Sequence, residues 1–195
     1  FKLNFIDGHP GSLQKEFSRA GRIGRLVHKA LELDIDSIEK LKIFAAASSD
    51  DEINEAFNLV EAFRNEQVFS EIAKLEGKRE LPVFTECCGI RFSGIADFVT
   101  DDFVLDYKTD SVLEKSAHRF QLWAYSKSLS LKTAKIAYLR HKEVITLGQQ
   151  NLEEIEKEAF QLIEKIKAGD FKANPRKEVC SYCRYKTICK EALTE

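Results

Sequence analysis

Residues 94–110, GIADFVTDDFVLDYKTD, set the architecture of this chain and raise its first chemical question. Their apolar and β-branched residues favour two strands joined by a short turn. Asp97 and Asp106 nevertheless interrupt the apolar runs, and Lys108 follows the second aspartate by two residues. Charged groups in such strands cost free energy unless a partner compensates for them. The sequence therefore predicts that something binds between these side chains.

The two strands of this stretch, 94–100 and 103–109, are expected to pair as a hairpin through a two-residue turn. In that register Asp97 faces Asp106, with Cβ atoms ~5 Å apart on one face of the sheet. Like charges at this spacing repel each other, so an unaided pair is destabilising. A divalent cation between the two carboxylates removes the repulsion.

Lys108 projects from the same face as Asp106, whereas Leu105 and Tyr107 point into the opposite layer, because side chains alternate along a strand. Hard carboxylate oxygens select Mg²⁺ or Mn²⁺, which leave coordination positions open for water and a phosphate. The alternative is an exposed ion pair of Asp106 with Lys108, worth less than ~1 kcal/mol. For these residues alone, the ion pair is the better interpretation.

The remainder of the chain alternates between helical and strand patterns and predicts a mixed α/β (α+β) fold. Asn151 with Glu154 resembles a capping box at the start of the last helix, which should end near Gly169. The expected helices cover residues 19–33, 36–46, 51–76, 116–129 and 151–169. The expected strands cover residues 80–88, 90–100, 103–109, 134–140 and 143–147, and the first three should be antiparallel.

Composition favours one domain with a real core, since the chain has 195 residues and 44% hydrophobic content. The net charge of -2 and the pI near 6.2 mean that contact with a polyanion requires a local basic patch. No run of eighteen apolar residues and no basic-then-apolar leader is present, so we expect no membrane partner and a cytoplasmic location. The chain lacks methionine and begins with Phe1, so we expect it to be part of a longer polypeptide.

We expect a main domain over residues 1–170, with a helical part at 1–77 and a core at 78–147. Residues 171–195 change character and should form a basic, cysteine-containing lobe packed on that domain. Basic side chains crowd this segment, and such a local cluster favours contact with a phosphate backbone. The basic residues expected to bind DNA are Arg176, Lys177, Arg184 and Lys186.

Four short motifs carry a family resemblance, although each of them is weak alone. A lone helical histidine such as His28 is more often a packing or surface residue than a ligand, and Gln121 with Tyr125 fits an ordinary amphipathic helix edge. The motifs are GRLVH (24–28), GIAD (94–97), LDYKT (105–109) and QLWAY (121–125). In this order, over about residues 20–140, the chain resembles the RecB-like branch of the PD-(D/E)xK nuclease superfamily.

The resemblance implies a restriction-endonuclease-like core, with a central mixed sheet flanked by helices. It also implies a catalytic Mg²⁺ or Mn²⁺ ion, with ligands from His28, Asp97, Asp106 and the backbone carbonyl of Tyr107. Lys108 would orient or help to deprotonate the attacking water and stabilise charge on the phosphate. Gln121 and Tyr125 would contact the nucleic-acid backbone or brace the lysine.

Cys180, Cys183 and Cys189 have a C-x2-C-x5-C spacing that suits Zn²⁺ or an iron–sulfur cluster. The segment resembles the one that supplies three ligands to a [4Fe-4S] cluster in AddB nuclease subunits and CRISPR-adaptation nucleases. In those relatives the fourth cysteine lies upstream of the nuclease core, but no cysteine precedes Cys87 here. The fourth ligand could lie before Phe1, Cys87 or Cys88 could replace it, or the cluster could be absent.

The first functional interpretation is a Mg²⁺- or Mn²⁺-dependent DNA nuclease, with exonuclease action on single strands or DNA ends. From the family only, it would belong to a helicase–nuclease of DNA repair and recombination, with the helicase as a subunit or as a domain of the same polypeptide. A catalytically inactive nucleic-acid-binding module on the same fold is the alternative. A third interpretation is an iron–sulfur, redox or regulatory module built on the cysteine trio.

Overall fold

A five-stranded mixed sheet organises the part of the chain that contains the acidic hairpin. The strands, in the order β1-β2-β3-β4-β5, are β1 (Lys78–Cys87), β2 (Ile90–Val99), β3 (Val104–Lys108), β4 (Ala134–Tyr138) and β5 (Glu143–Leu147). Neighbouring strands are antiparallel except β3 and β4, which are parallel. A parallel pair requires a crossover connection, and α5 (Arg119–Leu129) supplies it. The expected mixed α/β fold is confirmed.

This architecture comes from a computed structural model, which describes residues 18–116, 118–170, 172–173, 175–183 and 185–193. Within those residues, the chain from 18 to 161 forms one compact unit, and residues from 162 onward belong to a second. The second unit contains the short helix α7 (Lys177–Tyr182). No helix among the described residues is long and apolar enough to cross a membrane.

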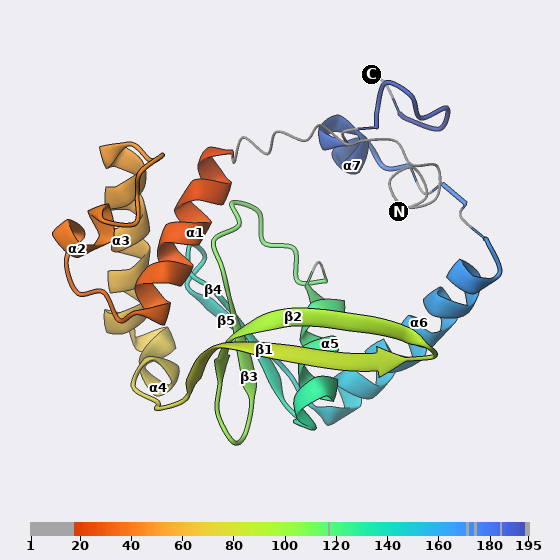
Figure 1. The fold of residues 1–195 in the computed structure, drawn as a ribbon, viewed down its shortest axis with the longest axis horizontal. Helices are drawn as coiled ribbons and strands as arrows, with labels where there is room; N and C mark the ends of the chain where they lie inside the picture. The colour runs from red at the N-terminus through yellow and green to blue at the C-terminus, as the bar shows by residue number, and fades with distance from the viewer. Residues whose placement is uncertain (1–17, 117, 171, 174, 184, 194–195) are drawn as a thin grey trace. The chain divides into compact units, whose positions relative to one another are not determined.

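The hairpin of β2 and β3 has the register expected from the sequence. Phe98 pairs with Leu105 and Val99 with Val104, and Thr100 N–H donates to the Phe103 carbonyl to close a two-residue turn. The ladder stops after the Phe98–Leu105 pair, one step before Asp97 and Asp106 would face each other. β1 and β2 continue as a longer ribbon, whereas β3 turns to its parallel neighbour (Figure 1).

Helices cover both faces of this sheet. On one face, α1 (Arg19–Glu32) packs with α3 (Asp50–Asn65), and their apolar side chains share a core with Phe98, Leu105 and Tyr107 (Figure 1). On the other face, α5 buries Leu122 and Trp123. Asp106 faces the α5 layer, where Gln121 contacts it, whereas Asp97 lies within reach of His28 on α1.

The helical part departs from the expected boundaries in one place that matters for packing. The predicted helix 51–76 is interrupted at Glu66, whose backbone is extended with ψ 137°, and continues as the 3₁₀ turn η2 (Gln67–Phe69) and α4 (Ser70–Ala73). The interruption turns Phe69 into the core, where its ring centroid lies 5.3 Å from that of Phe63. The predicted helix 36–46 is also shorter, as α2 (Ile38–Lys42).

The predicted capping box at Asn151 and Glu154 is wrong. The last long helix, α6 (Gln149–Lys167), begins two residues earlier, and Asn151 lies inside its first turn. There its Oδ1 accepts a hydrogen bond from Gly148 N–H at 3.2 Å. A polar side chain three residues after the cap can reach back to the cap amide, so the same asparagine signals a start one turn upstream. The expected end near Gly169 is confirmed, because Gly169 adopts φ 71° just after the helix.

Candidate active site

Asp97 and Asp106 lie side by side in the sheet at the point where the β2–β3 ladder ends. Their side chains are almost inaccessible, with 8% and 1% of their surface exposed. Two carboxylates buried this deeply repel each other and lose the hydration that stabilises their charge. The groups that surround them therefore decide what the site can bind.

Asp97 is held on both of its oxygens. Its Oδ2 accepts a hydrogen bond from the backbone N–H of Tyr107 at 2.7 Å, so the carboxylate satisfies a strand amide where the ladder has stopped. Its Oδ1 lies 3.1 Å from Nδ1 of His28 on α1. The carboxylate thus joins the sheet to the first helix, and its orientation is fixed from two directions.

Asp106 has one satisfied oxygen and one that accepts no aligned hydrogen bond. Gln121 on α5 donates its Nε2 to Oδ1 at 2.8 Å. The ammonium of Lys108 forms an ion pair with Oδ2, although the contact does not have hydrogen-bond geometry. Burial, together with the charge of Asp97, raises the pKa of Asp106 to about 6 against the opposing influence of Lys108 and His28. A cation bound beside this carboxylate would favour its charged form.

Lys108, Gln121 and Tyr125 form one polar network next to Asp106. Lys108 Nζ donates to Gln121 Oε1 at 3.3 Å, and Gln121 Nε2 lies 2.9 Å from the hydroxyl of Tyr125. Gln121 and Tyr125 are four residues apart on α5 and therefore share one face of that helix. The ring of Tyr125 lies against Gly94 on β2, where an added Cβ would come within 2.7 Å of it. This close approach explains why the first position of the GIAD motif is a glycine.

His28 enters the site from α1, off the apolar stripe formed by neighbours such as Val27 and Leu31. Burial alone would lower its pKa, but the hydrogen bond and charge of Asp97, with the charge of Asp106, outweigh that influence and raise it. Its ring also meets the edge of Tyr107, with centroids 6.2 Å apart. His28 is therefore an integral part of the acidic cluster.

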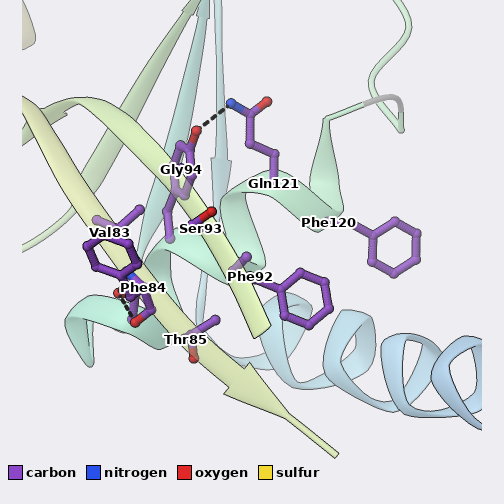
Figure 2. Close-up of a pocket in the computed structure, with 11 residues that line it drawn as sticks. Val83, Phe84, Thr85, Phe92, Ser93, Gly94, Phe120 and Gln121 are labelled. Atoms are coloured by element: carbon purple, nitrogen blue, oxygen red, sulfur yellow. Dashed lines mark hydrogen bonds between the residues drawn. The ribbon is translucent and has the colours of Figure 1, made fainter. Parts of the chain in front are cut away.

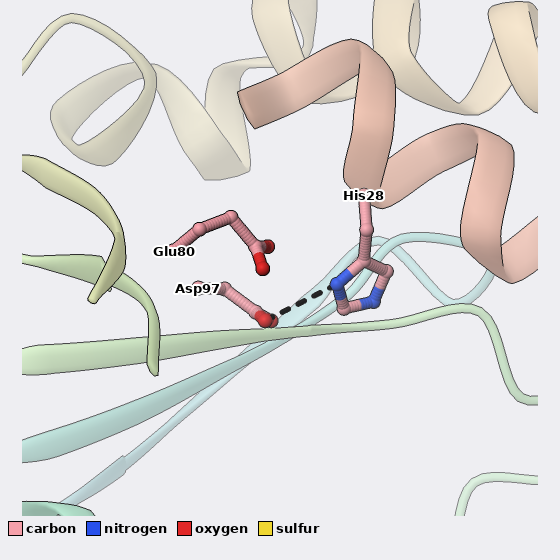
Figure 3. A group of neighbouring side chains, drawn as sticks. All are labelled: His28, Glu80 and Asp97. Carbon is pink, nitrogen blue, oxygen red and sulfur yellow. Dashed lines mark hydrogen bonds and ion pairs between the residues drawn. The ribbon is translucent and has the colours of Figure 1, made fainter. Parts of the chain in front are cut away.

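Glu80 is a member of the cluster that the sequence analysis missed. One ligand atom each from His28, Glu80 and Asp97 lies within 4.8 Å of the others, and Figure 3 shows all three side chains converging from α1 and two neighbouring strands. Burial, followed by the charge of Asp97, raises the pKa of Glu80. Its backbone has φ 48°, an unusual conformation for a residue other than glycine.

The register of the β1–β2 ribbon was the signal that could have revealed Glu80. Arg79 pairs with Phe98 and Leu81 with Ala96, so Glu80 stands opposite Asp97 in that register. The β2–β3 ladder ends at the Phe98–Leu105 pair, and Asp97 and Asp106 are the next residues beyond it on the two strands. Three acidic positions therefore form a row across three strands, and only two of them belong to the motifs noticed in the sequence.

The donor set of this row fits a divalent cation. It offers carboxylate oxygens and one imidazole nitrogen, ligand types that divalent metal ions accept in proteins. The raised pKa of Asp106 and its poorly satisfied Oδ2 show that negative charge is undercompensated there. The closest grouping of ligand atoms contains Glu80 but not Asp106, whose Oδ2 pairs with Lys108 instead.

A sequence-family comparison agrees with this geometry. The model for the PD-(D/E)XK nuclease superfamily matches residues 1–190. The chain belongs to this superfamily. PD-(D/E)XK nucleases generally use divalent metals, so the family assignment and the donor set support the same class of activity, a nuclease.

Two solved structures align with this chain at low sequence identity. A candidate exonuclease from Eubacterium rectale aligns with a TM-score of 0.60 and 16% identity, over 93% of this chain and 79% of that one. The structure of SSO0001 aligns with a TM-score of 0.45 and 16% identity, over 88% of this chain and 86% of that one. No curated protein matches the chain in sequence. The first likeness agrees with the restriction-endonuclease-like core expected for a PD-(D/E)XK nuclease.

The structure brings together most of the side chains proposed for the nuclease site. Each of them contacts at least one other member through the hydrogen bonds and ion pairs given above: His28, Asp97, Asp106, Lys108, Gln121 and Tyr125. The amide of Tyr107 is committed to Asp97. A role for the Tyr107 carbonyl as a ligand stays a prediction.

The C-terminal cysteines lie in the second unit and carry no disulfide. Cys180 is buried on α7, whereas Cys183 and Cys189 are partly exposed. Among the described residues, the His28 cluster is the one group of three or more potential ligands whose atoms approach closely enough to hold a metal. An iron–sulfur cluster bound by these cysteines stays a prediction.

Cys87 and Cys88 have separate local roles in the β1–β2 ribbon. Cys87 is buried in β1, and burial raises the pKa of its thiol. Cys88 is exposed at φ 51° and precedes Gly89 at φ 75°, so the two form the tight turn between the strands. Positive φ at both central residues is the signature of a type I′ turn.

The basic side chains predicted to bind DNA belong to the same second unit. Arg176 and Lys177 are exposed and Lys186 is partly exposed, whereas Arg184 lies outside the described residues. Their contact with nucleic acid stays a prediction, as does the packing of a 171–195 lobe on the main domain.

Proposed function

We propose that this chain is a metal-dependent DNA nuclease whose catalytic groups are His28, Asp97, Asp106 and Lys108. The observation that carries the proposal is the buried pair of carboxylates, joined to an imidazole on one side and to an ammonium on the other. Stability alone would favour apolar residues at such positions. In a site that binds a cation and a phosphate, the carboxylates and the imidazole can contact the cation and the ammonium can contact the phosphate.

His28, Glu80 and Asp97 would hold the cation, with Asp106 at the edge of the same acidic row. When bound, a divalent ion polarises the scissile phosphate and lowers the pKa of a coordinated water molecule. Asp97 is suited to hold its ligand geometry because Tyr107 N–H and His28 fix both of its oxygens. Rigid positioning of this kind removes much of the entropic barrier to reaction.

Lys108 is the group best placed to act on the attacking water and the phosphate. Its side chain is only 16% exposed, and Asp106 and Gln121 hold the ammonium at the side of the acidic row. It can orient the water by hydrogen bonding and place positive charge beside the phosphate as negative charge develops there. Tyr125 braces Gln121, which in turn orients Asp106 and Lys108.

The finer parts of the proposal rest on the RecB-like motifs. They favour exonuclease action on single strands or ends, Mg²⁺ or Mn²⁺ as the ion, and a helicase partner in DNA repair in the cytoplasm. The nuclease domain would cover residues 1–170. The basic lobe at 171–195, with or without a [4Fe-4S] cluster, would contribute Arg176, Lys177, Arg184 and Lys186 to DNA binding.

The test is cleavage of end-labelled single- and double-stranded DNA with Mg²⁺ or Mn²⁺, comparing wild type with Lys108→Ala and Asp106→Ala. Both variants should lose cleavage by about 100-fold or more while keeping most of their DNA affinity. Lys115→Ala is the matched control, since Lys115 forms an exposed ion pair with Glu143 outside the site. Retained cleavage in both site variants would contradict the proposal, and product lengths would show the polarity of digestion.

A further inference from the structure

An apolar pocket adjoins the catalytic network and is not used by the mechanism above. It has a volume of about 290 Å³ and lies between the β1–β2 ribbon and α5 (Figure 2). Phe92 on β2 and Phe120 on α5 contribute aromatic rings to its lining, and Gln121 and Tyr125 complete the side toward Asp106. Two residues therefore belong both to the pocket and to the polar network of the site.

The order of residues along α5 places this pocket one helical turn from the acids. Gln121 touches Asp106, and Ala124, Tyr125 and Ser128 follow toward the C-terminal end of the helix as pocket-lining residues. One turn of helix advances about 5.4 Å, and Gln121 itself lines the pocket, so the pocket directly adjoins Asp106. A strand whose phosphate lies at Asp106 would thus bring a neighbouring base to the mouth of the pocket.

The chemistry of the lining suits a planar aromatic group. The rings of Phe92 and Phe120 provide π-faces, and the ring of Phe92 is fixed by an edge contact with Trp123 at 5.8 Å. The Arg119 guanidinium lies 4.9 Å from the Phe120 ring centroid, where Glu158 holds it by an ion pair, and it helps to fix that ring at the rim. The volume is at the lower limit of small-molecule pockets, about 300 Å³, so it suits one ring system and not a stacked pair.

We propose that this pocket binds a single unstacked nucleobase of the strand whose phosphate occupies the catalytic site. The inference rests on the proposed nuclease function and adds a substrate class to it, nucleic acid with at least one base free of its duplex partner. Stacking on aromatic side chains holds bases in this way without reading their sequence. A base in a duplex cannot enter the pocket unless it first leaves its pair.

The experiment uses the full 195-residue chain and a fluorescein-labelled single-stranded oligodeoxynucleotide in which one abasic site is moved through successive positions. Binding is measured by fluorescence anisotropy in EDTA, so it does not depend on catalysis, and cleavage is measured separately with Mn²⁺. For wild type we expect one position at which loss of the base weakens binding by roughly ten-fold. The intact single strand should also bind more tightly than a blunt duplex of the same sequence.

Phe120→Leu keeps the Phe92–Trp123 contact and an apolar lining but removes one ring. In this variant the abasic position should weaken binding by no more than about two-fold, because the stacking partner is gone. Phe120→Tyr should restore the wild-type penalty. Phe160→Leu, at a partly exposed phenylalanine on α6 outside the pocket, is the matched control and should behave as wild type.

The outcomes separate this inference from the proposed function. Wild-type protein that binds and cleaves with no sensitive abasic position would overturn the pocket and leave the nuclease proposal intact. The same holds if Phe160→Leu and Phe120→Leu lose the penalty equally. Protein that shows the abasic penalty and its loss in Phe120→Leu, but does not cleave, would support the pocket and overturn the nuclease proposal. Absence of binding in EDTA would overturn the pocket, and absence of cleavage with Mn²⁺ as well would overturn both proposals.

Discussion

At the scale of single residues, the site is a row of acids whose charge is only partly compensated. Glu80, Asp97 and Asp106 lie on three consecutive strands, His28 contacts Asp97, and Lys108 pairs with Asp106. Repulsion within such a row destabilises the protein unless a cation joins it. We therefore expect the affinity for a divalent cation to depend most on the acidic side chains of this row.

Glu80→Gln should weaken metal binding while leaving the fold in place. The substitution keeps the shape of the side chain but removes one negative charge from the group formed with His28 and Asp97. Loss of one such partner typically lowers metal affinity by about 10- to 100-fold. Isothermal titration with Mn²⁺ measures the change directly, without reference to cleavage.

The matched control for Glu80 is Glu86→Gln on the same strand. Glu86 is exposed and forms an ion pair with Arg91 at the turn end of the ribbon, away from the cluster. Its substitution should leave Mn²⁺ affinity unchanged. Equal affinity in wild type and Glu80→Gln would remove Glu80 from the set of ligands.

Sequence patterns were sufficient to predict the candidate site residues that lie in short motifs. All six were expected in one place, and the structure joins His28 to Asp97 and forms one network of Asp106, Lys108, Gln121 and Tyr125. Glu80 was not expected, because its membership depends on the register of β1 against β2 and on a positive φ. Neither property is visible in the spacing of residues along one strand.

At the scale of elements, the close packing of α5 on β2 holds the polar network in position. Gly94 permits this approach, since the Tyr125 ring occupies the space where a side chain at that position would project. Tyr125 then braces Gln121, and Gln121 orients both Asp106 and Lys108. Helix placement and catalytic geometry are therefore linked through one glycine.

Gly94→Ala should lower the rate of cleavage strongly while the protein stays folded. The added methyl group displaces the Tyr125 ring and disturbs Gln121, and a shift of about 1 Å at a catalytic group can lower the rate up to about 100-fold. The free energy of unfolding should fall by about 1–3 kcal/mol from overpacking. Initial cleavage rates and urea unfolding together test both parts.

Gly148→Ala is the control for that substitution, because a Cβ at Gly148 meets no atom within 4 Å. It should leave both the rate and the unfolding free energy near wild type. If Gly94→Ala cleaves as fast as Gly148→Ala, the position of Tyr125 does not affect the rate of cleavage.

The contact between α1 and α3 makes stability depend on acid pH. Arg22 donates to both oxygens of Glu52, at 3.0 and 2.6 Å, and this hydrogen bonding lowers the pKa of Glu52 from 4.5 to about 2 against the influence of burial. An acid with a depressed pKa in the folded state binds fewer protons than in the unfolded state between those two values. Its stabilisation is therefore complete above about pH 4.5 and is lost as the pH falls toward 2.

Glu52→Gln should flatten this dependence. Urea unfolding between pH 6 and pH 3 should show a smaller loss of unfolding free energy in the variant than in wild type, because the titrating group is gone. Glu71→Gln, at an exposed position on α4, should retain the wild-type slope. Identical slopes in wild type and Glu52→Gln would show that Glu52 does not contribute.

Element order and the β2–β3 register could be predicted from the sequence, because hydrophobic periodicity and the residues of the short turn determine them. The break at Glu66 could not, since no proline or glycine marks it and the burial of Phe69 against Phe63 decides it. The start of α6 was misplaced because Asn151 caps from inside the helix and not from its edge. Tertiary packing and side-chain reach, not local propensity, account for both differences.

At the scale of the whole molecule, a bound metal ion should connect α1 to the sheet and so stabilise the folded state. The cluster takes His28 from the helix and Glu80 and Asp97 from two strands, so a shared ligand adds to the stability of the folded state alone. This connection predicts a response of global unfolding to metal.

Mn²⁺ at 100 times its Kd should raise the unfolding free energy by about 2.7 kcal/mol, or the Tm by about 5–10 °C, relative to EDTA. Asp97→Asn should lose most of this shift, because a neutral amide is a weaker ligand. Differential scanning calorimetry of both proteins in EDTA and in Mn²⁺ measures it. A wild-type Tm that does not change with Mn²⁺ would argue against a cation held by these residues.

The distance along the chain between His28 and Asp97, 69 residues, also has a kinetic consequence. Contacts between remote segments form late, because closing a long loop must precede them, whereas a hairpin such as β2–β3 forms from local sequence. During refolding, circular dichroism should recover while the imidazole is still away from the carboxylates. Nuclease activity would thus be among the last properties to return, and a chain still emerging from the ribosome would not yet be able to cleave its substrate.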